Sequence, residues 1–144
     1  MNFRPINLLS AIYKTMSRAV LRRITDTLDQ NVGVEQAGFR RGFSTTDHIH
    51  TLKVIIENRT EYNMPLHLAF VDFAKAFDSV EWNAVWNSLT EAGIEPPLVT
   101  LLKRIYEASK SSVIVNGVLV DIDLGRGVRQ GDSLSPKLFT SVLR

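Results

Sequence analysis

The apolar residues of the chain follow a helical spacing in most regions. Between Leu9 and Leu28 they recur at every third or fourth position, which predicts one amphipathic helix of about five turns. Its stripe is Leu9, Ile12, Tyr13, Met16, Val20, Ile24 and Leu28. Further helices are expected where this spacing follows a capping residue or a proline, after Ser44, after Ser79, from Pro96 and from Pro136.

The second of these helices carries an apolar face that we expect to point inward, formed by Ile49, Leu52, Ile55 and Ile56. Gly93 stands where a C-terminal glycine cap would end the helix after Ser79. Ser135 and Pro136 are expected to be the N-cap and first residue of the last helix.

A different pattern occupies residues 66–73, LHLAFVDF, which are nearly all apolar. This pattern predicts a strand buried on both faces, with Asp72 at its C-terminal end. A carboxylate in that position is costly unless hydrogen bonds, a cation or a metal ion compensate it. The residues alone leave two interpretations open, in which Asp72 is a metal ligand or caps the following turn.

A hairpin is indicated by Asn116-Gly117 between the β-branched runs 113–115 and 118–120. This dipeptide favours a type I′ turn, because both central residues must adopt positive φ. A glycine-rich, charged loop follows at residues 125–136. Helices and strands do not alternate one by one along the chain, which favours an α+β fold over a doubly wound sheet.

Composition narrows the class of protein. The 144 residues are 44% hydrophobic and 22% charged, as in a globular domain, and their formal net charge is +2. The absence of Cys excludes disulfides and thiolate metal sites and fits an intracellular protein. His48 and His50 lack a third ligand nearby, so a zinc site is not favoured. No apolar run reaches membrane-spanning length, and a membrane partner is not expected.

Charge is unevenly distributed. Residues 1–41 hold seven Lys or Arg against three Asp or Glu, residues 42–123 hold six against eleven, and residues 124–144 hold four against one. Two basic ends around an acidic middle suit a polyanion lying across the ends. Lys14, Arg18 and Arg22 form a basic line at four-residue steps, which is either a nucleic-acid contact or the solvated face of the helix.

Four segments in this order resemble reverse transcriptases of non-LTR (LINE-type) retrotransposons: FRPINLLSAIYK (3–14), QAGFRRGFSTTDHI (36–49), LAFVDFAKAFDSV (68–80) and GVRQGDSLSPKLF (127–139). The resemblance implies an incomplete right-hand polymerase with helices packed on a small antiparallel sheet. Residues 1–62 would be part of the fingers. Residues 63–144 would be part of the palm, truncated before the family's Asp-Asp motif.

The resemblance also implies an activity, the addition of deoxynucleotides to a primer 3′ end by two-metal phosphoryl transfer on an RNA template. Asp72 would be the catalytic residue that binds Mg²⁺, with the Phe73 backbone carbonyl as a neighbouring ligand. Arg4, Phe77 and Gln130 would contact the nucleoside triphosphate. Expected template and primer contacts are Arg40, Arg41, Arg129 and Gly131. Without the resemblance, Arg4 would be read as a surface arginine and Phe77 as a core residue.

One part of the family's pattern is missing, because the sequence contains no Asp-Asp pair. Asp121 and Asp123 would share a strand face but precede the RQGD segment, so they are not favoured as replacements. We therefore expect the isolated chain to be inactive and to need the remainder of the polymerase. The alternatives are a non-catalytic RNA- or DNA-binding remnant of a retroelement and a decayed product without a role. A polymerase that meets chromosomal DNA suggests the nucleus.

Overall fold

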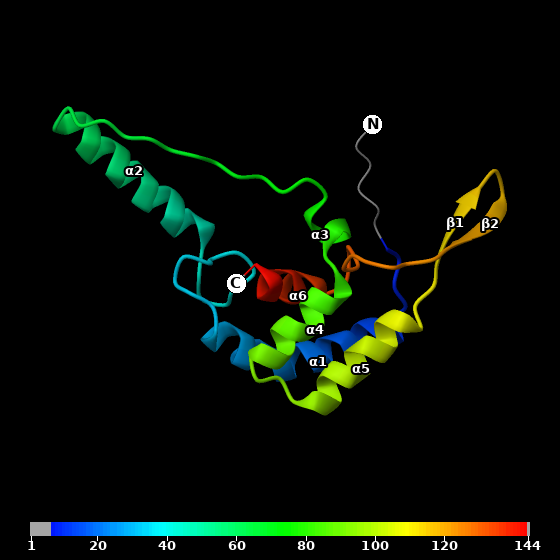
Figure 1. Cartoon of the computed structure of the whole chain (residues 1–144). Helices are drawn as coiled ribbons and strands as arrows, with labels where there is room; N and C mark the ends of the chain where they lie inside the picture. The colour runs from blue at the N-terminus through cyan, green and yellow to red at the C-terminus, as the bar shows by residue number, and fades with distance from the viewer. Residues whose placement is uncertain (1–6, 144) are drawn as a thin grey trace. The chain divides into compact units, whose positions relative to one another are not determined.

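The computed structural model describes residues 7–143. It is mostly helical, with one small antiparallel sheet (Figure 1). The elements are α1 (Ala11–Gln30), α2 (Thr45–Glu61), α3 (Ala76–Ser79), α4 (Trp82–Glu91), α5 (Pro96–Glu107), β1 (Ser111–Val115), β2 (Val118–Ile122) and α6 (Ser135–Val142). Two compact units are present. The first comprises the described parts of Met1–Val32 and Lys75–Arg144, and the second is Gly33–Ala74. The division at residue 62 into fingers and palm stays a prediction.

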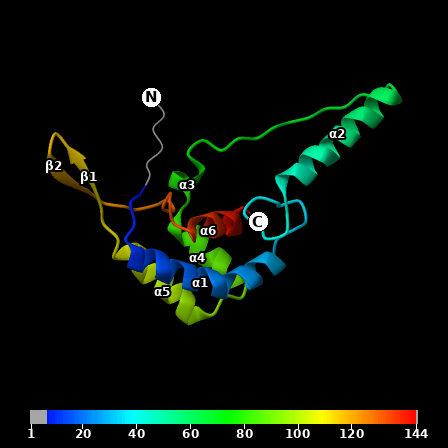
Figure 2. The same ribbon diagram turned by 180° about the vertical axis from the view of Figure 1, so that it is seen from behind.

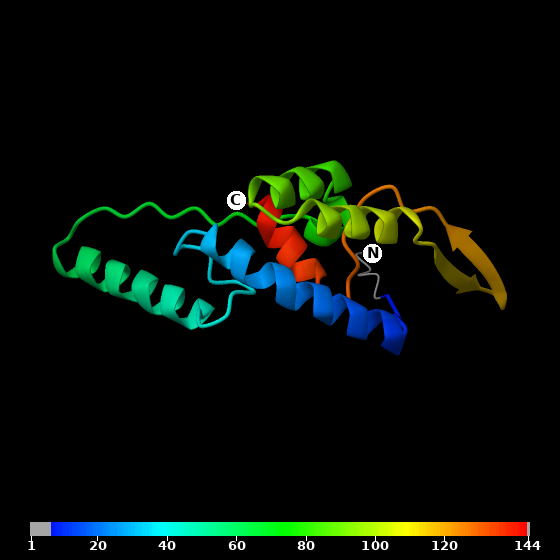
Figure 3. The same cartoon turned by 90° about the horizontal axis from the view of Figure 1, so that it is seen from below.

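Four helices form the core of the first unit. The predicted stripe of α1 is confirmed where it faces inward, at Val20, Ile24 and Leu28, whereas Ile12 is 84% exposed. Helix α6 contacts both α1 and α4, and α4 also contacts α5 (Figure 2 and Figure 3). The fully buried side chains of these helices include Ile24, Leu89 and Leu138. The helices therefore bury their apolar faces against one another.

Helix ends largely follow the capping residues. Ser10 accepts a hydrogen bond from the Tyr13 backbone N–H, and α4 ends in the predicted glycine cap at Gly93 (φ +84°). The Ile94 N–H donates to the Leu89 carbonyl, which completes a Schellman motif. Two predicted N-caps were wrong, one by two residues and the other by one. Glu81, not Ser79, precedes α4, and Leu134, not Ser135, precedes α6.

The hairpin prediction is confirmed. Val115 pairs with Val118, and Asn116 and Gly117 have φ values of 51° and 80°, as a type I′ turn requires. The strands are exposed, apart from the half-buried Ser111. The expectation that helices pack on this sheet was therefore wrong, because α1, α4, α5 and α6 bury their apolar faces against one another.

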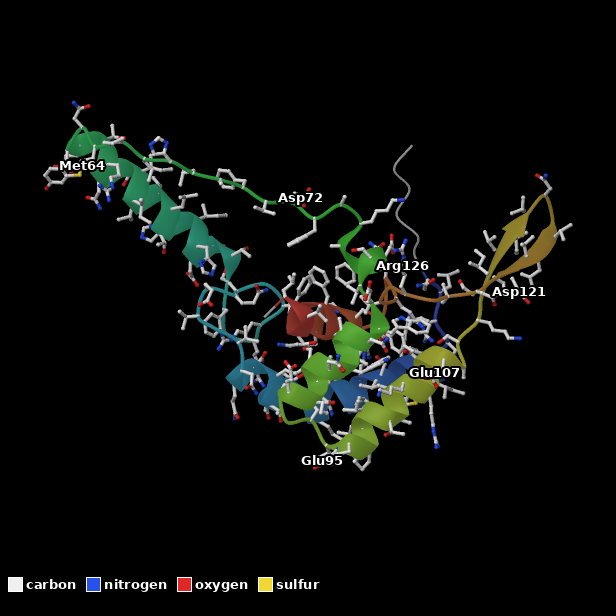
Figure 4. The ribbon with its side chains drawn as sticks, viewed as in Figure 1. Met64, Asp72, Glu95, Glu107, Asp121 and Arg126 are labelled. Atoms are coloured by element: carbon white, nitrogen blue, oxygen red, sulfur yellow. The ribbon has the colours of Figure 1, made fainter. Side chains whose placement is uncertain are left out.

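The predicted buried strand at residues 66–73 was also wrong. This segment has no regular structure, and Phe70 and Val71 are 82% and 80% exposed. Asp72 is exposed along the extended chain that follows Met64 (Figure 4). A buried strand needs neighbours for its backbone N–H and C=O groups. Within residues 7–143 the two strands, β1 and β2, pair with each other and leave this segment without such neighbours.

Helix α2 begins as predicted, because the Ser44 hydroxyl accepts a hydrogen bond from the Thr46 N–H. Its predicted inward face was wrong, since the helix contains no buried residue and Ile49 is 68% exposed. The Ser44 cap satisfies a backbone N–H at the start of the helix, whereas burial of the apolar face requires a partner surface. In the described part of the chain, no helix has the length and apolar character needed to cross a lipid bilayer.

Candidate functional site

The loop at 125–134 is joined to the end of the 68–80 segment by backbone hydrogen bonds. The Val128 N–H donates to the Phe77 carbonyl at 2.8 Å, and the Gly127 N–H donates to the Val80 carbonyl at 2.7 Å. The Trp82 indole N–H donates to the Gly127 carbonyl at 2.8 Å. Two segments separated by about fifty residues in the sequence thus meet in the first unit.

Gly127 allows this approach. Its φ is +90°, and a Cβ at this position would lie 3.1 Å from the Asp78 carbonyl oxygen and 3.3 Å from the Phe77 carbonyl oxygen. Real Cβ atoms rarely come this close to backbone atoms, and positive φ is itself unfavourable for other residues. A larger residue would push the loop away from Phe77.

Phe77 is half-buried at this junction. Its ring stacks on Phe139 of α6 with centroids 5.0 Å apart and an interplanar angle of 16°. This contact agrees with the interpretation of Phe77 as a core residue, which packs on α6. The role under a nucleotide sugar stays a prediction.

Gln130 and Gly131 form the tip of the loop. The Gln130 carbonyl accepts a hydrogen bond from the Asn7 N–H at 2.9 Å. Gly131 is exposed and has φ +107°, a conformation that favours glycine. Asn7 stands three positions after Arg4 in the sequence, and Arg4 itself lies outside the described residues. The loop therefore meets the chain segment that precedes α1.

Sequence reasoning missed Asp132, which is only 4% exposed. Its carboxylate accepts hydrogen bonds from the Tyr13 hydroxyl at 2.7 Å, from the Ser17 hydroxyl and from the Leu134 N–H at 3.2 Å. We call Asp132, Tyr13 and Ser17 the Asp132 cluster. The available signal was Ser17, a hydroxyl among the inward positions of α1, which needs a buried polar partner.

Arg129 packs beside this cluster. Its guanidinium lies 4.8 Å from the Tyr13 ring centroid and 5.3 Å from the Tyr106 ring centroid, and it donates to the Ser109 hydroxyl. Burial and the hydrogen bond to Asp132 raise the pKa of Tyr13 well above its usual value. Burial raises the pKa of Tyr106 to about 12. Both phenols are therefore neutral at physiological pH, and Arg129 contacts α1 and the segment that ends α5.

The other predicted site residues lie in the second unit. Arg40 donates to the Gly33 carbonyl at 2.6 Å, and its guanidinium lies 3.9 Å from the Phe43 ring centroid. Arg41 is exposed, as are Asp72 and Phe73. The structure thus groups Phe77, Arg129, Gln130 and Gly131 in one unit and places Arg40, Arg41, Asp72 and Phe73 in the other.

The described side chains do not gather into a metal site. Among residues 7–143, no three His, Asp or Glu side chains are close enough together to hold a metal ion. The carboxylate of Asp121 accepts a cross-strand hydrogen bond from Ser112 on the exposed hairpin. One aspartate with one carbonyl does not supply the oxygen ligands that two Mg²⁺ ions need. The described residues therefore do not fit a complete two-metal site.

The whole chain matches a known protein family. The family model for reverse transcriptase (RNA-dependent DNA polymerase) matches residues 1–144. The chain is 29% identical over 140 residues to the transposon TX1 uncharacterized 149 kDa protein of Xenopus laevis, covering 96% of this chain and 11% of that protein. It is 29% identical over 140 residues to the retrovirus-related Pol polyprotein from type-1 retrotransposable element R2 of Bradysia coprophila, covering 96% and 16%.

It is also 28% identical over 142 residues to the RNA-directed DNA polymerase from mobile element jockey of Drosophila funebris, covering 96% of this chain and 15% of that protein. The chain thus spans about a tenth to a sixth of these three relatives, which come from retrotransposons and related mobile elements. The match along all of its residues shows that the chain belongs to the reverse transcriptase (RNA-dependent DNA polymerase) family.

Proposed function

We propose that the chain is the partial fingers and palm of an RNA-directed DNA polymerase that adds deoxynucleotides to a primer 3′ end. The observation that carries this proposal, beyond family membership, is the backbone contact between Val128 and Phe77. This contact joins residues 127–139, the segment that contains the RQGD sequence, to the residues that follow Asp72. The proposed partners are an RNA template, a DNA primer and deoxynucleoside triphosphates.

The proposed roles follow the predicted residues. Gln130 and Gly131 contact the new base pair and template, since Gly131 has no Cβ and its backbone can be approached closely. Phe77 lies under the sugar, and Arg4 contacts the triphosphate through its guanidinium. Arg129 is a weaker candidate for template contact, because its guanidinium already interacts with Tyr13 and Ser109. Arg41 remains a candidate for template phosphates, and Arg40 is a weaker one because its guanidinium interacts with the Gly33 carbonyl and the Phe43 ring.

Asp72 is the proposed catalytic carboxylate. Reverse transcriptases typically use Mg²⁺, which would stabilise the charge that develops on the transferred phosphoryl group. Asp72 and the Phe73 carbonyl would supply only part of the ligand set, so other carboxylates of the polymerase must complete it. We infer that the 144-residue chain by itself does not polymerise.

Primer extension tests these roles. On a primed RNA template with Mg²⁺, a full-length polymerase carrying this segment should lose extension with Asp72→Ala and keep it with Asp123→Ala, a matched exposed aspartate. Equal extension by both variants would contradict the assignment of Asp72. Extension by the purified 144-residue chain, abolished by Asp72→Ala, would overturn the inference that this chain is inactive alone.

The alternative function is nucleic-acid binding without catalysis. Lys14, Arg18 and Arg22 are all exposed on α1, away from its buried stripe. If they contact a single strand, their joint replacement by Gln should lower the slope of log affinity against log salt by about 2. The control is the equally exposed set Lys103, Arg104 and Lys110, replaced in the same way. Binding without extension in the full-length protein would favour this alternative.

A further inference from the structure

The Asp132 cluster connects two parts of the chain that are far apart in sequence. Tyr13 and Ser17 are one turn apart on α1, and Asp132 follows them by more than a hundred residues. Both hydroxyls donate to the carboxylate, one to each oxygen. A buried carboxylate is unfavourable unless donors surround it, so this site specifies one arrangement of the loop on the helix.

The cluster lies immediately beside the loop tip. Asp132 follows Gly131 directly and is two residues from Gln130. The Gln130 carbonyl accepts a hydrogen bond from the Asn7 N–H. On the other side of the tip, the Val128 N–H donates a hydrogen bond to the Phe77 carbonyl. The tip is therefore held at both ends, by Val128 before it and by Asp132 after it. The short span between these two attachments leaves the backbone of Gln130 and Gly131 little freedom.

We propose that Asp132 is a positioning residue, whose carboxylate, held by Tyr13 and Ser17, fixes the backbone of Gln130 and Gly131 in the conformation that meets the template. The part that concerns the template rests on the proposed function. The part that concerns loop geometry does not. Asp132 acts through its neighbours and is not assigned to metal or substrate.

Amide hydrogen exchange on the 144-residue chain tests the geometry. Tyr13→Phe removes one hydroxyl and keeps the ring beside Arg129, so the fold should persist. We expect the Asn7 amide, which is bonded to Gln130, to exchange at least tenfold faster, with the Leu89 amide of α4 changing much less. Ser88→Ala is the control, because it removes a hydrogen bond between α4 and the Ser141 carbonyl of α6, away from the loop.

A uniform acceleration across Asn7 and Leu89, equal in Tyr13→Phe and Ser88→Ala, would mean a loss of global stability only and would overturn the proposal. Unchanged exchange at Asn7 would overturn it as well. Asp132→Asn is a second variant of similar shape, and it should affect the Asn7 amide in the same direction as Tyr13→Phe.

Steady-state kinetics of a full-length polymerase test the functional part. With poly(rA)/oligo(dT) and dTTP, Tyr13→Phe should raise KM for dTTP several-fold more than it lowers kcat, and Ser88→Ala should change neither. An unchanged KM together with faster Asn7 exchange would overturn the positioning role in catalysis. An inactive wild-type enzyme would instead contradict the proposed function, while the exchange data would still decide whether Asp132 fixes the loop.

Discussion

Gly127→Ala should weaken the junction between the RQGD segment and Phe77. The added methyl group would lie 3.1 Å from the Asp78 carbonyl oxygen, and the φ of +90° is unfavourable for alanine. Backbone strain costs about 1–2 kcal/mol. Displacement of the loop would also weaken the hydrogen bonds that Gly127 and Val128 donate, each of which contributes about 1 kcal/mol. The expected loss is therefore about 3 kcal/mol in the free energy of unfolding.

Gly93→Ala separates the two contributions. Gly93 has nearly the same φ, +84°, but no atom lies within 4 Å of its Cβ position. It should show the strain alone, about 1–2 kcal/mol. The effect of Gly→Ala on the unfolded chain is shared by both variants and cancels in their difference.

Urea denaturation measures the comparison. With an m-value of about 2 kcal/mol/M, Gly127→Ala should lower the urea midpoint by about 1.5 M and Gly93→Ala by about half of that. Equal shifts at unchanged m-value would refute the argument, because they would mean that the close approach to Asp78 has no energetic consequence.

Two further predictions concern buried polar groups. Lys137→Met should destabilise the chain by about 1–3 kcal/mol, because Lys137 of α6 pairs with Asp29 of α1 in a largely buried position, and adding Asp29→Leu should recover part of the loss in urea denaturation. Tyr106 keeps its proton in the folded state to about pH 12, whereas in the unfolded chain it ionises near pH 10. Stability should therefore be unaffected by this group below pH 10 and fall above it, by about 1.4 kcal/mol at pH 11. Tyr106→Phe should remove this part of the fall in alkaline urea titrations, and Tyr62→Phe, which alters an exposed tyrosine, should not.

Features fixed by adjacent residues could be predicted from the sequence. The turn at Asn116-Gly117 requires positive φ at two positions, and only these residue types adopt it readily. The cap at Gly93 and the N-cap at Ser44 depend in the same way on residues within one helical turn.

Features that depend on a partner far away in the sequence could not be predicted from the sequence. Residues 66–73 have the composition of a buried strand, but strand formation needs a neighbouring strand that the composition does not specify. The apolar face of α2 likewise identifies a surface without identifying what covers it. The pattern of residues 66–73 by itself suggested Asp72 as a metal ligand or a cap, whereas Gln130 became a candidate only through the family resemblance.

The anchoring of the loop also lay beyond sequence reasoning. The glycine-rich, charged composition of residues 125–136 predicts an exposed loop, whereas Asp132 within it is only 4% exposed. Ser17, a polar residue at an inward position of α1, indicates a buried partner, but that partner, Asp132, lies 115 positions away. A polar residue at an inward helix position predicts that a partner exists, and only the fold identifies it.

The exposed hairpin offers a labelling site for measurements of nucleic-acid binding. Because the chain contains no cysteine, a single thiol introduced at Leu119, which is 65% exposed on β2, would be unique. A fluorophore or spin label could be attached there away from the buried residues of α1, α4, α5 and α6. Nucleic-acid binding could then be followed by anisotropy in wild type and in each variant, with one common labelling site throughout.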